Sequence, residues 1–167
     1  LYTAVGRALT IWESAEDILA SVYGRLVSDK YSKYDFGLKT SHDTRSKMIK
    51  KASDAFFGYE GVDQSIRSGL SLAIDHFSHA SKRRNDFAHW VVQCTTTEEG
   101  QQYLLMPSES NSRKLDEFLF DGKKSKDFGA YKISNWYSAA AIDEFSDKFE
   151  ALKNCAICIL NSLPPQT

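Results

Sequence analysis

The sequence has 167 residues, of which 42% are hydrophobic and 13% aromatic, enough to build one domain with a substantial core. This composition excludes a disordered or fibrous chain. The 21 basic and 22 acidic residues give a net charge of -1, so a contact with nucleic acid has to come from a local basic patch. We expect a single domain over residues 1–167.

The cysteines and the apolar runs of the sequence indicate the cellular compartment. Cys94, Cys155 and Cys158 form an odd and sparse set, which favours a reducing compartment over a disulfide framework. We find no run of about 18 apolar residues and no signal-peptide pattern. The sequence therefore predicts a cytoplasmic protein with no membrane contact. Cys155 and Cys158 fall within a helical apolar pattern and are interpreted as small core residues.

Apolar residues recur at steps of three and four over about Thr3–Val27, the pattern of a long amphipathic helix. Glu16 falls on that apolar stripe, where a carboxylate is partly buried and requires a cationic partner. Two interpretations stay open. Glu16 reaches solvent at the edge of the stripe, or it faces Arg84 or His89 and orients that side chain.

Residues 28–39 are polar and aromatic and contain a glycine, so we expect a connection there. Thr40 or Ser41 can cap a second helix, which we expect to end near Gly58. Arg45 belongs by its spacing to the apolar side of this helix. An ordinary salt bridge is one interpretation of Arg45, and a contact to a substrate phosphate is the other.

Asp63 can cap a third helix, whose apolar stripe continues at helical spacing to Arg84. Arg84 follows Phe77 by seven residues, close to two turns, which turns it toward the core. His89 comes five residues later, about 140 degrees further around an unbroken helix. Either the helix ends or bends within residues 85–88, or the two side chains converge across a symmetry-related copy.

The pattern changes after the third helix. Residues 90–97 are rich in β-branched side chains and residues 102–106 form a second short apolar run, so we predict a β-hairpin. A polar loop is expected over residues 107–130. Ser134 is predicted to cap a long final helix that ends at Pro164. The predicted fold is all-α, a bundle of four main helices with a small β-hairpin before the last one.

One short motif carries the chemistry. Residues 84–89 read Arg-Asn-Asp-Phe-Ala-His. A guanidinium is suited to phosphate oxygens, and an imidazole can exchange a proton near neutral pH. Together they can hold a phosphodiester and move the protons that its cleavage requires. The pattern Arg-Asn-x-x-Ala-His in a small helical chain resembles the signature of the HEPN superfamily, in which an Arg, usually followed by a polar residue, precedes a His by four to six intervening residues.

The resemblance implies a metal-independent endoribonuclease without a cofactor, commonly a homodimer in which two copies of the motif line one cleft. By position, Arg84 would bind and polarise the scissile phosphate, and His89 would act as general base or acid. Asn85 would position the RNA or fix the two catalytic side chains. The 2′-hydroxyl of RNA is an internal nucleophile, so its deprotonation beside a stabilised phosphate suffices for cleavage to a cyclic phosphate.

The neighbours of the motif are candidate substrate contacts. Lys82 and Arg83 either extend a phosphate-binding strip or form a solvated basic helix end. Trp90 stands where many family members have a small residue, and it either narrows the cleft or offers a stacking surface for a base. We expect RNA as the partner, with an inhibitory protein as a possible second one.

The leading hypothesis is a ribonuclease in a toxin-antitoxin, defence or RNA-processing role. The alternative is a non-catalytic HEPN-like RNA-binding or dimerisation module of a larger protein. Without the surrounding motif, His89 would be interpreted as a capping or core histidine. Asp86 is interpreted as a surface acid. His76 and His79 are interpreted as surface residues. With His89 they have no carboxylate or thiol at ligand spacing, so no metal site is predicted.

Overall fold

A computed structural model describes residues 1–29, 31–58, 63–97, 100–107 and 136–165. In these ranges the chain is mostly helical, with one antiparallel hairpin before the last helix. The elements are α1 (Tyr2–Val27), α2 (Ser32–Gly37), α3 (His42–Phe57), α4 (Gln64–His89), β1 (Val91–Thr97), β2 (Gly100–Met106) and α6 (Ala139–Ser162). No helix in the described ranges combines the length and apolarity that crossing a membrane requires.

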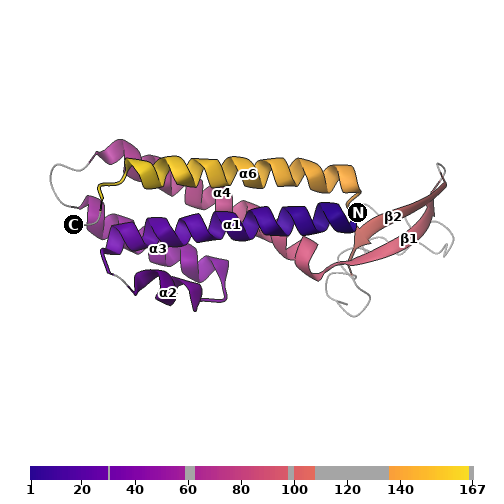
Figure 1. Ribbon diagram of the computed structural model, residues 1–167, viewed down its shortest axis with the longest axis horizontal. Coiled ribbons are helices and arrows are strands. Elements are labelled where there is room, and N and C mark those ends of the chain that lie inside the picture. The colour runs from indigo at the N-terminus through magenta and orange to yellow at the C-terminus, as the bar shows by residue number, and fades with distance from the viewer. Residues whose placement is uncertain (30, 59–62, 98–99, 108–135, 166–167) are drawn as a thin grey trace, which may run out of the picture.

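The long helices lie along one axis (Figure 1). α1 and α6 run side by side, and both begin at the end of the bundle from which the hairpin extends. α4 runs in the opposite direction and ends where β1 begins. α3 packs against α1 and α4, and α2 packs against α1. The last turns of α4 are therefore placed at the junction between bundle and hairpin.

Trp12 joins the four long helices in the core. Its side chain is 1% exposed, and its ring centroid lies 5.6 Å from that of His42, 5.7 Å from Phe77 and 5.1 Å from Phe149. These partners belong to α3, α4 and α6. Burial of an aromatic ring of this size with edge-on neighbours stabilises a fold by several kcal/mol, about 3 to 5 by truncation to alanine.

The predictions for α1, α3, α4 and the hairpin are confirmed in type and approximate bounds. Asp63 caps α4, because its carboxylate accepts a hydrogen bond of 2.8 Å from the Ser65 backbone N–H. The final helix differs in its start: it is capped by Ser138, whose hydroxyl accepts from the backbone N–H of Ala141. Ser134 and nearly all of the predicted loop lie outside the described residues.

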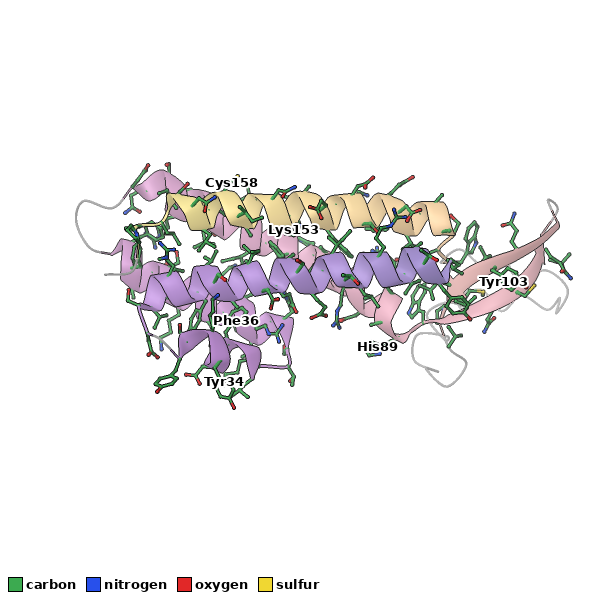
Figure 2. The ribbon with its side chains drawn as sticks, viewed as in Figure 1. Tyr34, Phe36, His89, Tyr103, Lys153 and Cys158 are labelled. Atoms are coloured by element: carbon green, nitrogen blue, oxygen red, sulfur yellow. The ribbon has the colours of Figure 1, made fainter. Side chains whose placement is uncertain are left out.

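The expected connection over residues 28–39 contains the short helix α2. Phe36 is 2% exposed and lies between α2 and α1, whereas Tyr34 points away from the bundle (Figure 2). Gly24 is buried on α1, and a Cβ there would lie 3.2 Å from Ser32 Oγ, so glycine permits the close packing of α2. A six-residue helix is too short to show helical periodicity, and it depends on its packing against α1.

The interpretation of Cys155 and Cys158 as core residues is wrong, because both thiols are exposed and free. Ala156, between them, is fully buried. Successive helical positions differ by about 100 degrees, so one buried position does not bury its neighbours. Figure 2 places Cys158 on the side of α6 that faces away from α1.

Candidate functional site

The motif lies on one unbroken helix. α4 continues to His89, and Trp90 ends it in an extended conformation while its backbone N–H donates to Asp86 O at 2.9 Å. The alternative that the helix ends or bends within residues 85–88 is therefore wrong. Arg84 and His89 are separated by about 140 degrees around the axis and roughly 7.5 Å along it. A single chain does not bring the two side chains together.

Arg84 is partly buried and anchored at one end. Its side chain is 30% exposed, and Nη2 donates to Glu13 Oε1 on α1 at 2.6 Å. Nη1 lies 3.5 Å from Asn85 Oδ1, the outer limit of a hydrogen bond. The buried Nε has no hydrogen-bond partner among the described residues. Arg84 is thus held in place with donor capacity left over.

His89 and Asn85 are open to solvent. Both side chains are exposed, and Figure 2 shows His89 at the end of α4 beside the start of the hairpin. A buried core histidine is excluded by this position.

Asp86 is 7% exposed, so its interpretation as a surface acid is wrong. It points toward the start of α6, where the Tyr137 hydroxyl donates to its Oδ2 at 3.3 Å. Arg83 Nη1 donates to the same Tyr137 oxygen at 2.9 Å and lies 3.4 Å from Asp86 Oδ2. Burial raises the pKa of the Tyr137 phenol above its usual value of 10.0, with Asp86 adding to the shift and Arg83 opposing it.

Tyr137 is itself fixed by the hairpin. Its backbone exchanges two hydrogen bonds with Leu105 on β2, at 3.0 and 3.1 Å. The hairpin therefore holds the hydroxyl that contacts Asp86. Trp90 is partly buried, and its ring centroid lies 5.3 Å from that of Tyr137. It packs against Tyr137 at the end of α4 and keeps part of its surface exposed.

Glu16 faces α3, so both interpretations of it are wrong: its carboxylate neither reaches solvent nor faces Arg84 or His89. Its side chain is 11% exposed, with Oε2 accepting from Arg45 Nη1 at 2.5 Å and Oε1 lying 3.2 Å from His42 Nδ1. Burial alone would raise the pKa of Glu16, but the hydrogen bonds and charges of His42 and Arg45 outweigh it and leave the pKa lowered. Ionised Glu16 is thus a structural partner of α3.

Arg45 is engaged within the fold. Besides the Glu16 carboxylate, its guanidinium donates to the Lys39 carbonyl at 2.8 Å. These contacts favour the salt-bridge interpretation of Arg45 over the phosphate contact. Lys82 is exposed, and the Arg83 side chain is 51% exposed. Both therefore remain accessible to a ligand beside the motif.

Sequence reasoning missed Glu13, His42 and Tyr137. Glu13 lies three residues before Glu16, but nothing in its neighbourhood indicates a partner 71 residues away. Tyr137 is 51 residues from Asp86 and has no local pattern. His42 follows the cap of α3, yet the contacts of its ring with Trp12 and Phe77 depend on packing alone.

Comparison with known proteins finds no matching family model, no matching curated protein and no matching solved structure. Within the described ranges no three or more His, Cys, Asp or Glu side chains are grouped to hold a metal ion. What the site can do chemically follows from Arg84, Asn85 and His89, with Glu13 as the anchor of the arginine.

Proposed function

We propose that this chain is an endoribonuclease of the HEPN type, which acts without a metal and as a homodimer. The observation that carries the proposal is the Arg-Asn-x-x-Ala-His motif at the exposed end of a bundle helix. Its His89 is open to solvent, and its Arg84 is anchored with an unpartnered N–H among the described residues.

The reaction requires one bond exchange at phosphorus. His89 removes the proton of the 2′-hydroxyl, the 2′ oxygen bonds to phosphorus, and the bond from phosphorus to the 5′ oxygen breaks. Arg84 stabilises the negative charge that accumulates on the phosphate oxygens. A protonated histidine returns a proton to the departing 5′ oxygen. The products are a 2′,3′-cyclic phosphate and a 5′-hydroxyl.

A second copy completes the site in this proposal. Arg84 and His89 diverge on one helix, so a phosphate that contacts Arg84 of one copy can meet His89 of the other. Two histidines in one cleft also supply a base and an acid. Lys82 and Arg83 extend the basic surface along the RNA backbone.

A specific observation favours the alternative, a non-catalytic RNA-binding or dimerisation module. Arg84 is already paired with the Glu13 carboxylate, and a phosphate has to compete with that ion pair. The two functions differ in their products, since a binding module leaves RNA intact. A single assay of the RNA products therefore distinguishes the two functions.

The test is incubation of the purified chain with a mixture of single-stranded and structured RNA in excess EDTA. We expect cleavage to 2′,3′-cyclic phosphate ends, which resist phosphatase until dilute acid opens the ring to a monophosphate. His89→Ala is expected to abolish cleavage. His79→Ala is the matched control, because His79 is another exposed histidine of α4 outside the motif, and it should cleave like the wild type.

The dimer is tested separately by analytical ultracentrifugation at micromolar concentration. Circular dichroism establishes that each variant keeps its helical content. Equal cleavage by wild type and His89→Ala would contradict the catalytic role. A folded dimer that binds RNA without cutting it would establish the alternative.

A further inference from the structure

A long groove runs between α4 and α6. It encloses about 1000 Å³, and its lining residues extend from Gly69 to Arg83 on α4 and from Phe145 to Cys155 on α6. Its apolar lining, which we call the floor, consists of Leu72, Ala73, Ala80, Phe145, Phe149, Ala151 and Leu152. Leu72 is 60% exposed although it is a large aliphatic side chain. An exposed apolar groove of this kind marks an interaction site.

The charges on the groove have one sign. Lys82, Arg83 and Lys148 line it together with two imidazoles, and no carboxylate is among its described lining residues. Lys148 Nζ lies 4.5 Å above the Phe145 ring, so its charge stands along the groove wall. The chain as a whole has a net charge of -1. The basic edge is therefore a local feature of the groove.

The length of the groove matches that of a short helix. The lining stretch on α4 is roughly 21 Å long and that on α6 roughly 15 Å, at 1.5 Å per residue. Three to four turns of a third helix cover such a length, about 14 residues. Gly69 leaves open space where a Cβ would stand, and the alanines of the floor allow a close approach.

We propose that the α4–α6 groove binds an amphipathic helix of a partner protein, with the apolar face of that helix on the floor and its acidic residues against Lys82, Arg83 and Lys148. The mode is that of helix recognition by a hydrophobic groove, with charge complementarity setting the choice of partner.

Two other occupants fit less well. In a twofold contact the basic residues of one groove meet the groove of the other copy, which has no carboxylate among its described lining residues, so their charges stay unpaired. An RNA backbone gains from the basic edge but gains nothing from an apolar floor, because its riboses and phosphates are polar. An acidic amphipathic helix satisfies both parts of the groove. This docking does not depend on the ribonuclease proposal.

The probe is a fluorescent synthetic peptide of about 16 residues with leucines at helical spacing and glutamates on either side of them. A matched peptide carries lysine at every glutamate position. We expect fluorescence anisotropy to report saturable binding of the acidic peptide and at least about tenfold weaker binding of the basic one.

Variants of exposed residues test the location. Leu72→Asp and Lys148→Glu are expected to weaken binding of the acidic peptide by about tenfold each. Lys51→Glu reverses an exposed charge on α3 that is not among the described lining residues of the groove and should leave binding unchanged. The proposal would be overturned if all variants bound the acidic peptide with equal affinity, or if the wild type bound both peptides with equal affinity.

Alkylation of the free thiols can locate the bound peptide without any mutation. Cys155 lines the groove, whereas Cys158 lies on the same helix outside its described lining and Cys94 lies on β1. The acidic peptide should slow alkylation of Cys155 only, as measured by mass spectrometry. Protection of Cys155 by RNA instead of the peptide, or dissociation of a dimer by Leu72→Asp, would assign the groove to another occupant and overturn the proposal.

Discussion

Arg84 Nη2 donates to Glu13 Oε1 at 2.6 Å, an ion pair that ties the motif on α4 to α1. The Glu13 side chain is 58% exposed and that of Arg84 30%. A pair this accessible contributes at most about 1 kcal/mol to stability. The ion pair has a larger effect on ligand binding, because the Glu13 carboxylate occupies N–H donors of Arg84 that a phosphate needs.

Glu13→Gln is expected to tighten RNA binding about three- to tenfold at low ionic strength, since it releases the Arg84 guanidinium and removes a negative charge. Fluorescence anisotropy with labelled single-stranded RNA measures the change. Asp17→Asn is the matched control, because it removes the same charge from the exposed side of α1 without a contact to Arg84. An equal gain in both variants would point to net charge alone.

Glu16→Ala is expected to lower the free energy of unfolding by about 3 kcal/mol, because it leaves two largely buried partners without their carboxylate. Those partners are Arg45 and His42, 18% and 13% exposed. Urea unfolding followed by circular dichroism measures the loss. Asp43→Ala on α3 breaks an exposed pair with Lys47 and should cost under about 1 kcal/mol. Similar losses in the two variants would contradict the buried role of Glu16.

Acidification tests the same carboxylate. The pKa of Glu16 is lowered in the folded chain from an ordinary value of 4.5, so its ionised form stabilises the fold above that pH. The contribution is lost as the pH falls below 4.5 toward the folded-state pKa. The stability difference between wild type and Glu16→Gln should therefore be constant near neutrality and shrink as the pH falls below 4.5. A difference independent of pH would assign the effect to packing.

The long helices were predictable because each repeats its apolar spacing over several turns, as α1 does around Trp12 and α4 around Phe77. The six-residue α2 has no such repeat. It is held by Phe36, whose burial depends on the facing surface of α1. Local periodicity thus indicates long elements, whereas short ones are determined by tertiary packing.

The motif was also readable from sequence, but its partners were not. Glu13 and Tyr137 lie far from Arg84 and Asp86 along the chain, and both are chosen by the way the helices pack. Glu16 was recognised as a carboxylate in need of a cation, yet its cation is on α3. Sequence spacing fixes which face a residue occupies, not which neighbour it meets.

Tyr137→Phe tests whether the hairpin supports the motif. The lost hydroxyl donates to Asp86 and accepts from Arg83, so the buried Asp86 loses one donor. We expect a loss of about 1 to 2 kcal/mol in unfolding free energy, because a buried carboxylate is left less well satisfied. Differential scanning calorimetry should report a Tm lower by roughly 3 to 6 °C.

The control for this variant is Tyr103→Phe, since Tyr103 is a 65% exposed tyrosine of β2 (Figure 2), and its Tm should match the wild type. Asp86→Asn removes the charge that the Tyr137 hydroxyl faces, so Tyr137→Phe should cost less in that background than in the wild type. Equal costs in both backgrounds would show that the hydroxyl acts independently of Asp86. A smaller cost of Tyr137→Phe in the Asp86→Asn background would show that the hydroxyl stabilises Asp86 within the motif. The hairpin would then support Asp86 through Tyr137, whose backbone is hydrogen-bonded to Leu105 on β2.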